Sequence, residues 1–213
     1  MSDPSLHEAL FTTRSMRRLK PDPVPRADLE YIIEAATMAP SAGNLQLWAF
    51  VVVTEQASRE RIAAAYREAG RAYIRDGVLA DPSTGDEQRR VYTQAMHNVE
   101  HLEEAPAIVV PCLTVPCPDS AAVGSGLFGS VYPAVQNLML AARSRGLGSV
   151  LLTLATDYCP VGPLETTPVR EVLDLPDSVR AVALIPVGYP VGSWGRPRRR
   201  PWPDCMHWER WNH

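Results

Sequence analysis

The chain has 213 residues and a formal net charge of −3, with 24 acidic and 21 basic residues. This length suits one domain or two small ones, and a hydrophobic content of 46% is typical of a folded globular protein. A net negative charge gives no overall attraction to nucleic acid or to anionic lipid. The amino terminus shows no signal-peptide pattern, and prolines interrupt the longest apolar stretch, 105–118. We therefore expect one cytoplasmic domain over residues 1–213 that binds neither membrane nor nucleic acid.

Cysteine and histidine spacing does not predict a metal site. No two of the four cysteines form a C-x-x-C pair. Cys205 lies near His207, but no second ligand pair accompanies them, and His97 and His101 share a helix face without an acidic or cysteine ligand. We expect reduced thiols and no bound metal. The four cysteines are Cys112, Cys117, Cys159 and Cys205.

The first half of the chain is predicted to be mainly helical. Ser5 and Glu8 have the spacing of a capping box, which predicts a helix to about Thr13. A second helix is predicted after Pro25, because apolar residues recur there at helical spacing. Ser58 is a candidate cap for a third helix. The apolar residues that indicate these helices and a fourth one are Leu29, Ile32, Ile33, Ala36, Ile62, Ala65, Tyr66, Ala69, Val91, Tyr92, Ala95, Val99 and Leu102.

The helical pattern weakens between residues 70 and 88. Turns are predicted at Asp76-Gly77 and over 81–86, where Asp, Pro, Ser and Gly cluster. Two interpretations remain open for this segment. It forms either a lid over a binding site or a plain surface excursion.

Strands alternate with helices in the second half. A strand is predicted over 107–110, ending at Pro111, with others over 149–154 and 179–187. A short helix is predicted to start at Thr167. Ser130 is predicted to cap a central buried helix. Its expected buried face is Val131, Val135, Leu138, Met139 and Ala142. The alternation predicts one α+β or α/β domain with four or five strands.

Residues 39–53 join a polar, turn-forming loop to a run of aromatic and β-branched residues. Such a loop, attached to a rigid strand, suits the binding of a flat and partly polar ligand. An ordinary helix-to-strand connection accounts for the same pattern, and from this stretch alone it is the simpler interpretation.

Two arginine clusters lie near opposite ends of the chain, at Arg14/Arg17/Arg18 and Arg198/Arg199/Arg200. Taken alone, the first cluster is more simply a solvated basic turn. Another interpretation is that both clusters converge on one phosphate, which would be held mainly by side chains because neither a Walker nor a Rossmann glycine pattern is present. Single-stranded nucleic acid is a rival ligand for the tail, where tryptophan accompanies arginine. No nucleophile stands out, which favours chemistry carried by a cofactor.

Five short segments, in their order along the chain, resemble the FMN-dependent nitroreductase family. They are 14–17 (RSMR), 39–48 (APSAGNLQLW), 146–149 (GLGS), 186–190 (PVGYP) and 198–201 (RRRP). The resemblance runs from about Leu6 to Trp211. It implies an α+β, three-layer fold with a mixed, mainly antiparallel sheet around a central buried helix. It also implies an intertwined homodimer with two FMN sites, in which residues 191–213 form an arm on the partner subunit.

The resemblance assigns expected roles to individual residues. Arg14 and Ser15 would hold the phosphate and ribityl chain of FMN, and Arg17 would lie near the pyrimidine edge of its ring. Thr153 would be placed to donate a hydrogen bond to N5. The phosphate is also expected to contact Arg198 and Arg199. The loop from the neighbouring subunit is expected to supply Pro40, Ser41, Asn44 and Gln46. The strand end at the N5 face is expected to supply Leu151, Leu152 and Thr153.

Two departures from the family pattern are visible. Thr13 precedes Arg14 where the family often has a second arginine, so one phosphate contact would be missing. Leu47 stands between Gln46 and Trp48 where proline is usual, which would reshape the loop without removing its polar groups.

The implied activity is ping-pong hydride transfer from NADPH or NADH, through flavin N5, to a nitroaromatic, a quinone or a related electron-poor small molecule. Three alternatives remain open: a reductive dehalogenase, a flavin-fragmenting relative, and a non-catalytic FMN-binding protein. Dehalogenases of the iodotyrosine type use glutamate, tyrosine and lysine in a lid. Glu68 and Tyr73 are present here, but the only lysine, Lys20, is remote in sequence from any lid, which argues against that substrate.

Overall fold

The computed structural model describes residues 4–114, 125–158 and 168–211. The predicted helix start at Thr167, together with Cys117 and Cys159, lies outside these ranges. The α-helices are α1 Leu6–Thr12, α2 Arg26–Thr37, α3 Gln56–Gly70, α4 Asp86–His101, α5 Ser125–Ser144 and α6 Pro168–Val172. The strands are β1 Trp48–Val53, β2 Ala107–Thr114, β3 Gly148–Ser149, β4 Val179–Ala181 and β5 Ile185–Gly188. Shorter helical segments are Ala42–Asn44, Leu102–Glu104, Trp202–Cys205 and a π-helix over Arg71–Val78.

The strands form one five-stranded sheet in the order β1-β2-β5-β3, with β4 also paired to β2. Every strand pair recorded among the described residues is antiparallel. The longest ladder joins β1 to β2 and runs from the Trp48–Leu113 pair to the Val53–Ile108 pair. The prediction of a four- or five-stranded sheet in an α+β fold is therefore confirmed.

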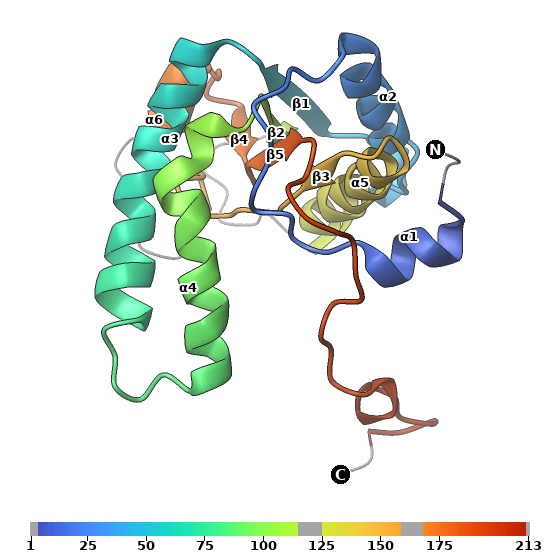
Figure 1. The fold of residues 1–213 in the computed structure, drawn as a ribbon. Helices are drawn as coiled ribbons and strands as arrows, with labels where there is room; N and C mark the ends of the chain where they lie inside the picture. The colour runs from blue at the N-terminus through green and yellow to red at the C-terminus, as the bar shows by residue number, and fades with distance from the viewer. Residues whose placement is uncertain (1–3, 115–124, 159–167, 212–213) are drawn as a thin grey trace.

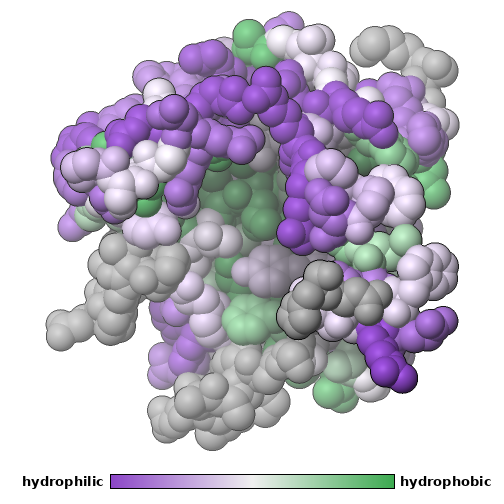
Figure 2. Space-filling view, turned by 90° about the horizontal axis from the view of Figure 1, so that it is seen from below, coloured by the Kyte–Doolittle hydropathy of each residue, from purple (hydrophilic) through white to green (hydrophobic). Residues whose placement is uncertain are grey.

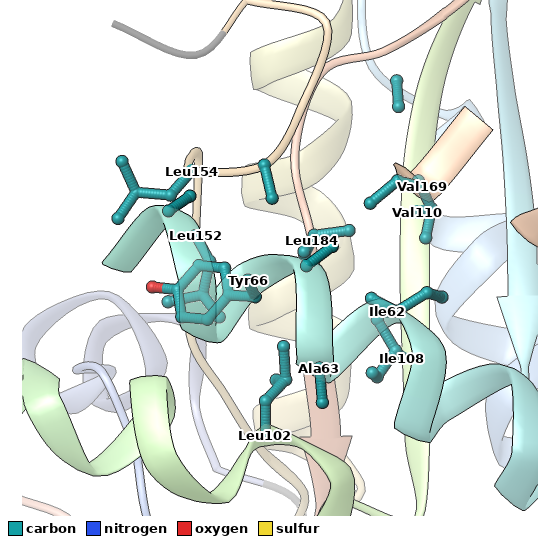
Figure 3. Close-up of a cluster of buried hydrophobic side chains, with 14 of the residues drawn as sticks. Ile62, Ala63, Tyr66, Leu102, Ile108, Val110, Leu152, Leu154, Val169 and Leu184 are labelled. Carbon is teal, nitrogen blue, oxygen red and sulfur yellow. The ribbon is translucent and has the colours of Figure 1, made fainter. Parts of the chain in front are cut away.

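The central strand β2 is buried on both faces and divides the core in two. Ile108 and Val110 face a cluster built on α3, where Ile62 and Tyr66 pack against Leu152 and Leu184 (Figure 3). Ala107 and Val109 face the opposite cluster, which α2 and α5 cover. Because successive strand residues point to opposite faces, one apolar strand supports both layers of helices. The result is a three-layer arrangement (Figure 1).

Helix α5 is the long buried helix predicted from its apolar pattern. Val131, Val135, Leu138 and Ala142 are at most 2% exposed, whereas Met139 is only partly buried. The prediction that Ser130 caps this helix was wrong, because α5 already begins at Ser125. Ser130 lies inside it and donates a hydrogen bond of 2.6 Å to the Gly126 carbonyl oxygen.

The sequence predicted that the strand ends at Pro111, but in the structure it does not. Strand β2 continues through it to Thr114. Pro111 lies opposite the break between β4 and β5, where three residues, 182–184, face the two residues 110 and 111. The Pro111 carbonyl accepts a 2.9 Å hydrogen bond from the Val182 amide. A bulge of this kind tolerates proline because one ladder amide can be missing there.

Two other local predictions also need correction. Helix α3 begins at Gln56 with Glu55 at its N-cap, and Ser58 lies inside the helix, where its hydroxyl donates to the Glu55 carboxylate at 2.7 Å. Asp76 and Gly77 lie in the π-helix rather than in a turn. The predicted turn over 81–86 is present, and Asp81 accepts a hydrogen bond from the Ser83 amide. The first turn of α3 is polar and charged rather than apolar, so the sequence pattern did not show where this helix begins. The π-helix is supported by its packing on α4.

Helices α3 and α4, with the π-helix between them, make a projecting helical hairpin (Figure 1). Its two arms lie in close contact at Gly70, where a Cβ atom would lie 2.5 Å from Cγ2 of Val99. Arg71 on one arm pairs with Glu100 on the other at 2.9 Å, and Arg67 pairs with Glu103 at 2.6 Å. Segment 70–88 is thus ordered by contacts that its weak periodicity did not reveal.

The predicted strands 149–154 and 179–187 are shorter and interrupted in the structure. The first is reduced to β3 and a single bridge between Leu152 and Leu184. The second is split into β4 and β5. The described residues after Val191 run as an extended arm away from the sheet (Figure 1). Trp202, Trp208 and Trp211 on this arm are 68–77% exposed.

Candidate functional site

The segment that carries Arg14, Ser15 and Arg17 is attached to the edge of the sheet. The Met16 amide donates a 3.0 Å hydrogen bond to the Ser149 carbonyl, and its side chain is buried. Gly148 makes this approach possible, because a Cβ atom there would lie 2.8 Å from the Met16 Cβ. With Met16 directed into the protein, Ser15 and Arg14 remain exposed beside it.

The carboxy-terminal arm runs beside the same segment. The backbone amide of Lys20 donates to the Tyr189 carbonyl at 2.7 Å, and the backbone amide of Val191 donates to the Arg18 carbonyl at 2.9 Å. Farther along, the Arg14 guanidinium donates to the Ser193 carbonyl at 2.8 Å. Two stretches from opposite ends of the chain are therefore held together by backbone hydrogen bonds.

A cavity of about 1010 Å³ lies between these two stretches. Arg14 and Ser15 line one side, and the arm contributes Arg198 and Arg199. The complete lining is Leu10, Phe11, Thr13, Arg14, Ser15, Glu87, Gln136, Met139, Arg196, Pro197, Arg198, Arg199, Arg200, Pro201 and Trp202. Arg14 thus lines the same cavity as Arg198, Arg199 and Arg200, whereas Arg17 and Arg18 do not line it. That these arginines hold one phosphate stays a prediction.

This cavity is strongly basic, and within the described residues its arginines have no carboxylate partner. Five arginines and one acidic residue, Glu87, line it. Among the described residues, none of these five guanidinium groups forms an ion pair with a carboxylate, and Glu87 pairs instead with Arg90 at 3.9 Å. Arg196 lies over the Phe11 ring, 5.1 Å from its centroid. Guanidinium groups without carboxylate partners suit a phosphate, which offers several acceptor oxygens for their hydrogen bonds.

Arg17 does not line that cavity but an adjoining one of about 310 Å³, which shares Arg14 and Ser15 with it. Helix α4 supplies Gln94 and His97 to the opposite wall. Burial lowers the pKa of Arg17, and nearby Tyr66 raises it to a smaller extent. The pKa of His97 is also lowered, mainly by burial and then by the neighbouring charges of His101 and Arg18. The smaller cavity thus combines a half-buried cation with a histidine that stays mainly neutral at pH 7.

The loop over 40–46 is exposed and lies outside both cavities. Gly43, Asn44 and Gln46 have φ values of 56°, 55° and 50°, a left-handed conformation that is uncommon for residues other than glycine. The Ser41 hydroxyl accepts a hydrogen bond from the Gln46 amide at 3.2 Å, and the Gln46 side-chain amide donates to Asn44 Oδ1 at 3.2 Å. These contacts hold the polar groups in a fixed arrangement at the surface.

The three residues predicted at the N5 face alternate in direction. Leu152 is buried in the core and exchanges both backbone hydrogen bonds with Leu184. Leu151 and Thr153 are exposed. Only these two of the three therefore have exposed side chains, and neither of them lines the two cavities.

Several lining residues were not among the sequence-predicted site residues. Gln136 and Met139, one turn apart on α5, face the larger cavity, and Gln94 and His97 do the same on α4 for the smaller one. A polar residue within the mainly apolar middle of α5, as at Gln136, is a signal that could have indicated this. Trp202 and Arg196 come from a tail without periodicity, so no pattern placed them.

Within the described ranges, no group of three or more His, Cys, Asp and Glu residues is arranged to hold a metal ion. His97 and His101 stack on one another, 4.7 Å apart. These same ranges contain no helix that is both long enough and apolar enough to cross a membrane.

Comparisons with known proteins agree on one family. The family model described as "Nitroreductase: Nitroreductase family" matches residues 10–189. An NADH dehydrogenase of Thermus thermophilus is 29% identical, with 94% of each chain covered. A 5,6-dimethylbenzimidazole synthase of Rhodospirillum rubrum is 29% identical over 88% of this chain and 85% of its own. The crystal structure of an oxidized iodotyrosine deiodinase bound to FMN and 3-iodo-L-tyrosine matches with a TM-score of 0.71 at 24% identity, covering 98% of this chain and 99% of its own.

Proposed function

Because this chain belongs to the nitroreductase family, we propose that it is an FMN-dependent NAD(P)H oxidoreductase that reduces nitroaromatic, quinone or related electron-poor acceptors. When bound, FMN would supply the hydride transfer between the nicotinamide donor and the acceptor. The observation that carries the proposal is the basic cavity, where unpaired arginines from both ends of the chain meet.

The residues of this cavity fit the phosphate end of FMN. Arg14, Ser15, Arg198 and Arg199 offer charge-assisted and hydroxyl hydrogen bonds on two sides of the same space. No carboxylate in the described residues competes for these four side chains by an ion pair. The volume of the cavity, about 1010 Å³, is at the upper end of the range of about 300–1,000 Å³ usual for ligand pockets.

The ring of FMN would extend toward the smaller cavity, where Arg17 supplies positive charge. Positive charge placed where negative charge accumulates on reduction favours the reduced form. Leu151 and Thr153 are exposed and available to its N5 face, and Thr153 would donate a hydrogen bond there. The apolar residues Leu10, Phe11, Met139 and Trp202 would exclude water around the bound group.

We also propose a homodimer, in which Pro40, Ser41, Asn44 and Gln46 reach the FMN of the partner subunit. The loop is exposed and rigidly hydrogen-bonded, and Met38 and Leu45 beside it are 72% and 64% exposed. Seen from below, the single chain is hollowed, with hydrophobic residues on the floor and hydrophilic ones around much of the rim (Figure 2). Exposed apolar surface rimmed by polar residues occurs at protein interfaces and ligand-binding grooves, and the proposed dimer would cover it.

The decisive experiment is the absorption spectrum of the purified protein, followed by anaerobic titration with NADPH and with NADH. We expect a yellow protein that either donor bleaches and that a nitroaromatic or a quinone reoxidises. A colourless protein that does not take up added FMN would overturn the proposal, and an FMN complex that neither nicotinamide reduces would indicate a non-catalytic flavin protein.

The same preparation should be offered 3-iodotyrosine under reducing conditions and oxygen after reduction. Iodide release would indicate the deiodinase activity, and conversion of FMN to 5,6-dimethylbenzimidazole would indicate the flavin-fragmenting one. Lys20 lines a different cavity, together with Glu8 and Arg143, which does not favour its use in gripping an amino-acid substrate.

A further inference from the structure

Asn98, on helix α4, has a buried side-chain oxygen that accepts no hydrogen bond from the described residues. The residue is 3% exposed. Its Oδ1 atom is buried and has no hydrogen-bond partner among the residues that the structure describes. Buried polar atoms in folded proteins are nearly always satisfied by a protein group or an ordered water, because an unmade hydrogen bond costs free energy. Asn98 therefore calls for a partner that the protein chain does not supply.

A very small cavity adjoins this residue. Its volume is about 10 Å³, close to the minimum of about 10–15 Å³ that one water molecule requires. Asn98 and Arg17 both line this cavity. The remaining lining residues are Leu19, His97, His101, Leu102, Glu104, Ala105 and Pro186. This space has room for about one water molecule.

Arg17 needs hydrogen-bond acceptors on this side. Burial lowers its pKa, and within the described ranges it forms no ion pair with a carboxylate. The acidic residue that lines this small cavity, Glu104, is already paired with Nδ1 of His101 at 2.9 Å. A half-buried guanidinium keeps donors that only water or a neutral acceptor can satisfy here.

We propose that one buried water bridges Asn98 and Arg17, accepting a hydrogen bond from the Arg17 guanidinium and donating one to Asn98 Oδ1. Asn98 is then a positioning residue: it holds Arg17 in place through the water and does not touch the cofactor itself. The effect on bound flavin rests on the proposed function, whereas the water itself does not depend on it.

The consequence for the flavin follows from charge. A guanidinium fixed at one position stabilises negative charge on the ring better than one that samples several positions, because preorganised charge needs no rearrangement when reduction occurs. Loss of the Asn98 oxygen should therefore make the midpoint potential of the bound flavin more negative. A tenfold loss in the relative affinity for reduced over oxidised FMN corresponds to about 30 mV for a two-electron couple.

The first test is structural and needs no flavin. A high-resolution crystal structure should show one water within hydrogen-bonding distance of both Asn98 Oδ1 and Arg17. In Asn98→Leu, whose side chain has the same branched shape but is bulkier and offers no acceptor, the water should be absent. A dry cavity in the natural protein, or an Asn98 amide bonded elsewhere, overturns the inference whether or not FMN binds.

The second test measures the midpoint potential of FMN-loaded variants. We expect a more negative potential for Asn98→Leu and a value close to the natural one for Asn98→Ser, whose hydroxyl keeps an acceptor and leaves room for water. Asn137→Leu is the matched control, because the Asn137 amide on α5 donates to the Ala35 carbonyl at 3.3 Å, away from Arg17. An equal shift in the control would assign the effect to general destabilisation and overturn the positioning role.

A double-variant cycle separates action through Arg17 from direct action. In the Arg17→Gln background, Asn98→Leu should leave the potential unchanged, since no guanidinium remains to be positioned. A full additional shift in that background overturns the inference. Failure of the natural protein to bind FMN would instead contradict the proposed function and leave the crystallographic water as the deciding observation.

Discussion

The Arg14 guanidinium donates a 2.8 Å hydrogen bond to the carbonyl oxygen of Ser193, which lies 179 residues later in the chain. This contact ties the arm that carries Arg198 and Arg199 to the segment that carries Ser15. It explains how one cavity receives arginines from both ends of the protein. The orientation of the arm and the chemistry of the cavity thus depend on the same side chain.

Replacing Arg14 should therefore weaken flavin binding in two ways. Arg14→Gln removes a charged donor to the phosphate and loosens the arm. A hydrogen bond to a charged group contributes about 1.5–3 kcal/mol, so we expect FMN affinity to fall roughly 10- to 150-fold in a fluorescence titration. Arg26→Gln is the control, since Arg26 is exposed and pairs only with Glu30. Unchanged affinity in Arg14→Gln would contradict its assignment to the phosphate site.

Gly148→Ala should displace the Arg14–Arg17 segment. The new Cβ atom would lie 2.8 Å from the Met16 Cβ and 3.0 Å from the Pro190 Cβ. Overpacking of this kind costs about 1–3 kcal/mol, and we expect a lower free energy of unfolding by denaturant together with weaker FMN binding. In Gly129→Ala, on an exposed part of α5, the Cβ atom meets nothing within 4 Å. That variant should be at least as stable as the natural protein.

Gly70 and Val99 should be coupled energetically. Gly70→Ala places a Cβ atom 2.5 Å from Cγ2 of Val99 and should destabilise the protein by about 1–3 kcal/mol. Val99→Ala alone leaves a void and also destabilises. The double variant should be more stable than the sum of the two effects predicts, as measured by urea unfolding. Strict additivity would show that the helical hairpin does not close as described.

Cys112 should make stability fall at alkaline pH. The side chain is fully buried, and burial raises the pKa of its thiol to about 12. The unfolded chain ionises this thiol near its usual pKa of about 8.5. The folded state binds the proton more tightly, so this contribution is complete below about pH 8.5 and is lost progressively as the pH rises toward 12.

Urea unfolding between pH 7 and 10 checks this expectation. The decline in the free energy of unfolding should be less steep in Cys112→Val than in the natural protein. Thiol labelling of the folded protein provides an independent measurement, because Cys205 is exposed and should react while Cys112 should not. Rapid modification of Cys112 at pH 8 without unfolding would contradict its burial.

Local sequence patterns identified most of the helices and the central strand correctly. The spacing of Leu29, Ile32 and Ala36 placed α2, and the apolar run that begins at Ala107 placed β2. Boundaries were predicted less well. Pro111 looked like a strand end because its tolerance depends on a bulge in a strand some 70 residues later, which no local window contains.

The chemistry of the candidate site was also partly legible in the sequence. Two arginine clusters without a phosphate-binding glycine loop indicated an anion held by side chains. That Arg17 faces a cavity different from the one containing Arg198, with α4 supplying His97 and Gln94, depends on how the helical hairpin packs against the amino-terminal segment.

By itself, the amino-acid sequence determined which residues are apolar enough to be buried, where helical spacing replaces strand spacing, and that its positive charge is concentrated near the two ends. Periodicity and composition are local properties, and they carry this information directly. Only the tertiary structure decided that Arg14 meets Ser193 and that Asn98 faces a space beside Arg17. Such contacts join residues far apart in the chain, and their geometry is set by the sum of many packing interactions rather than by any one segment.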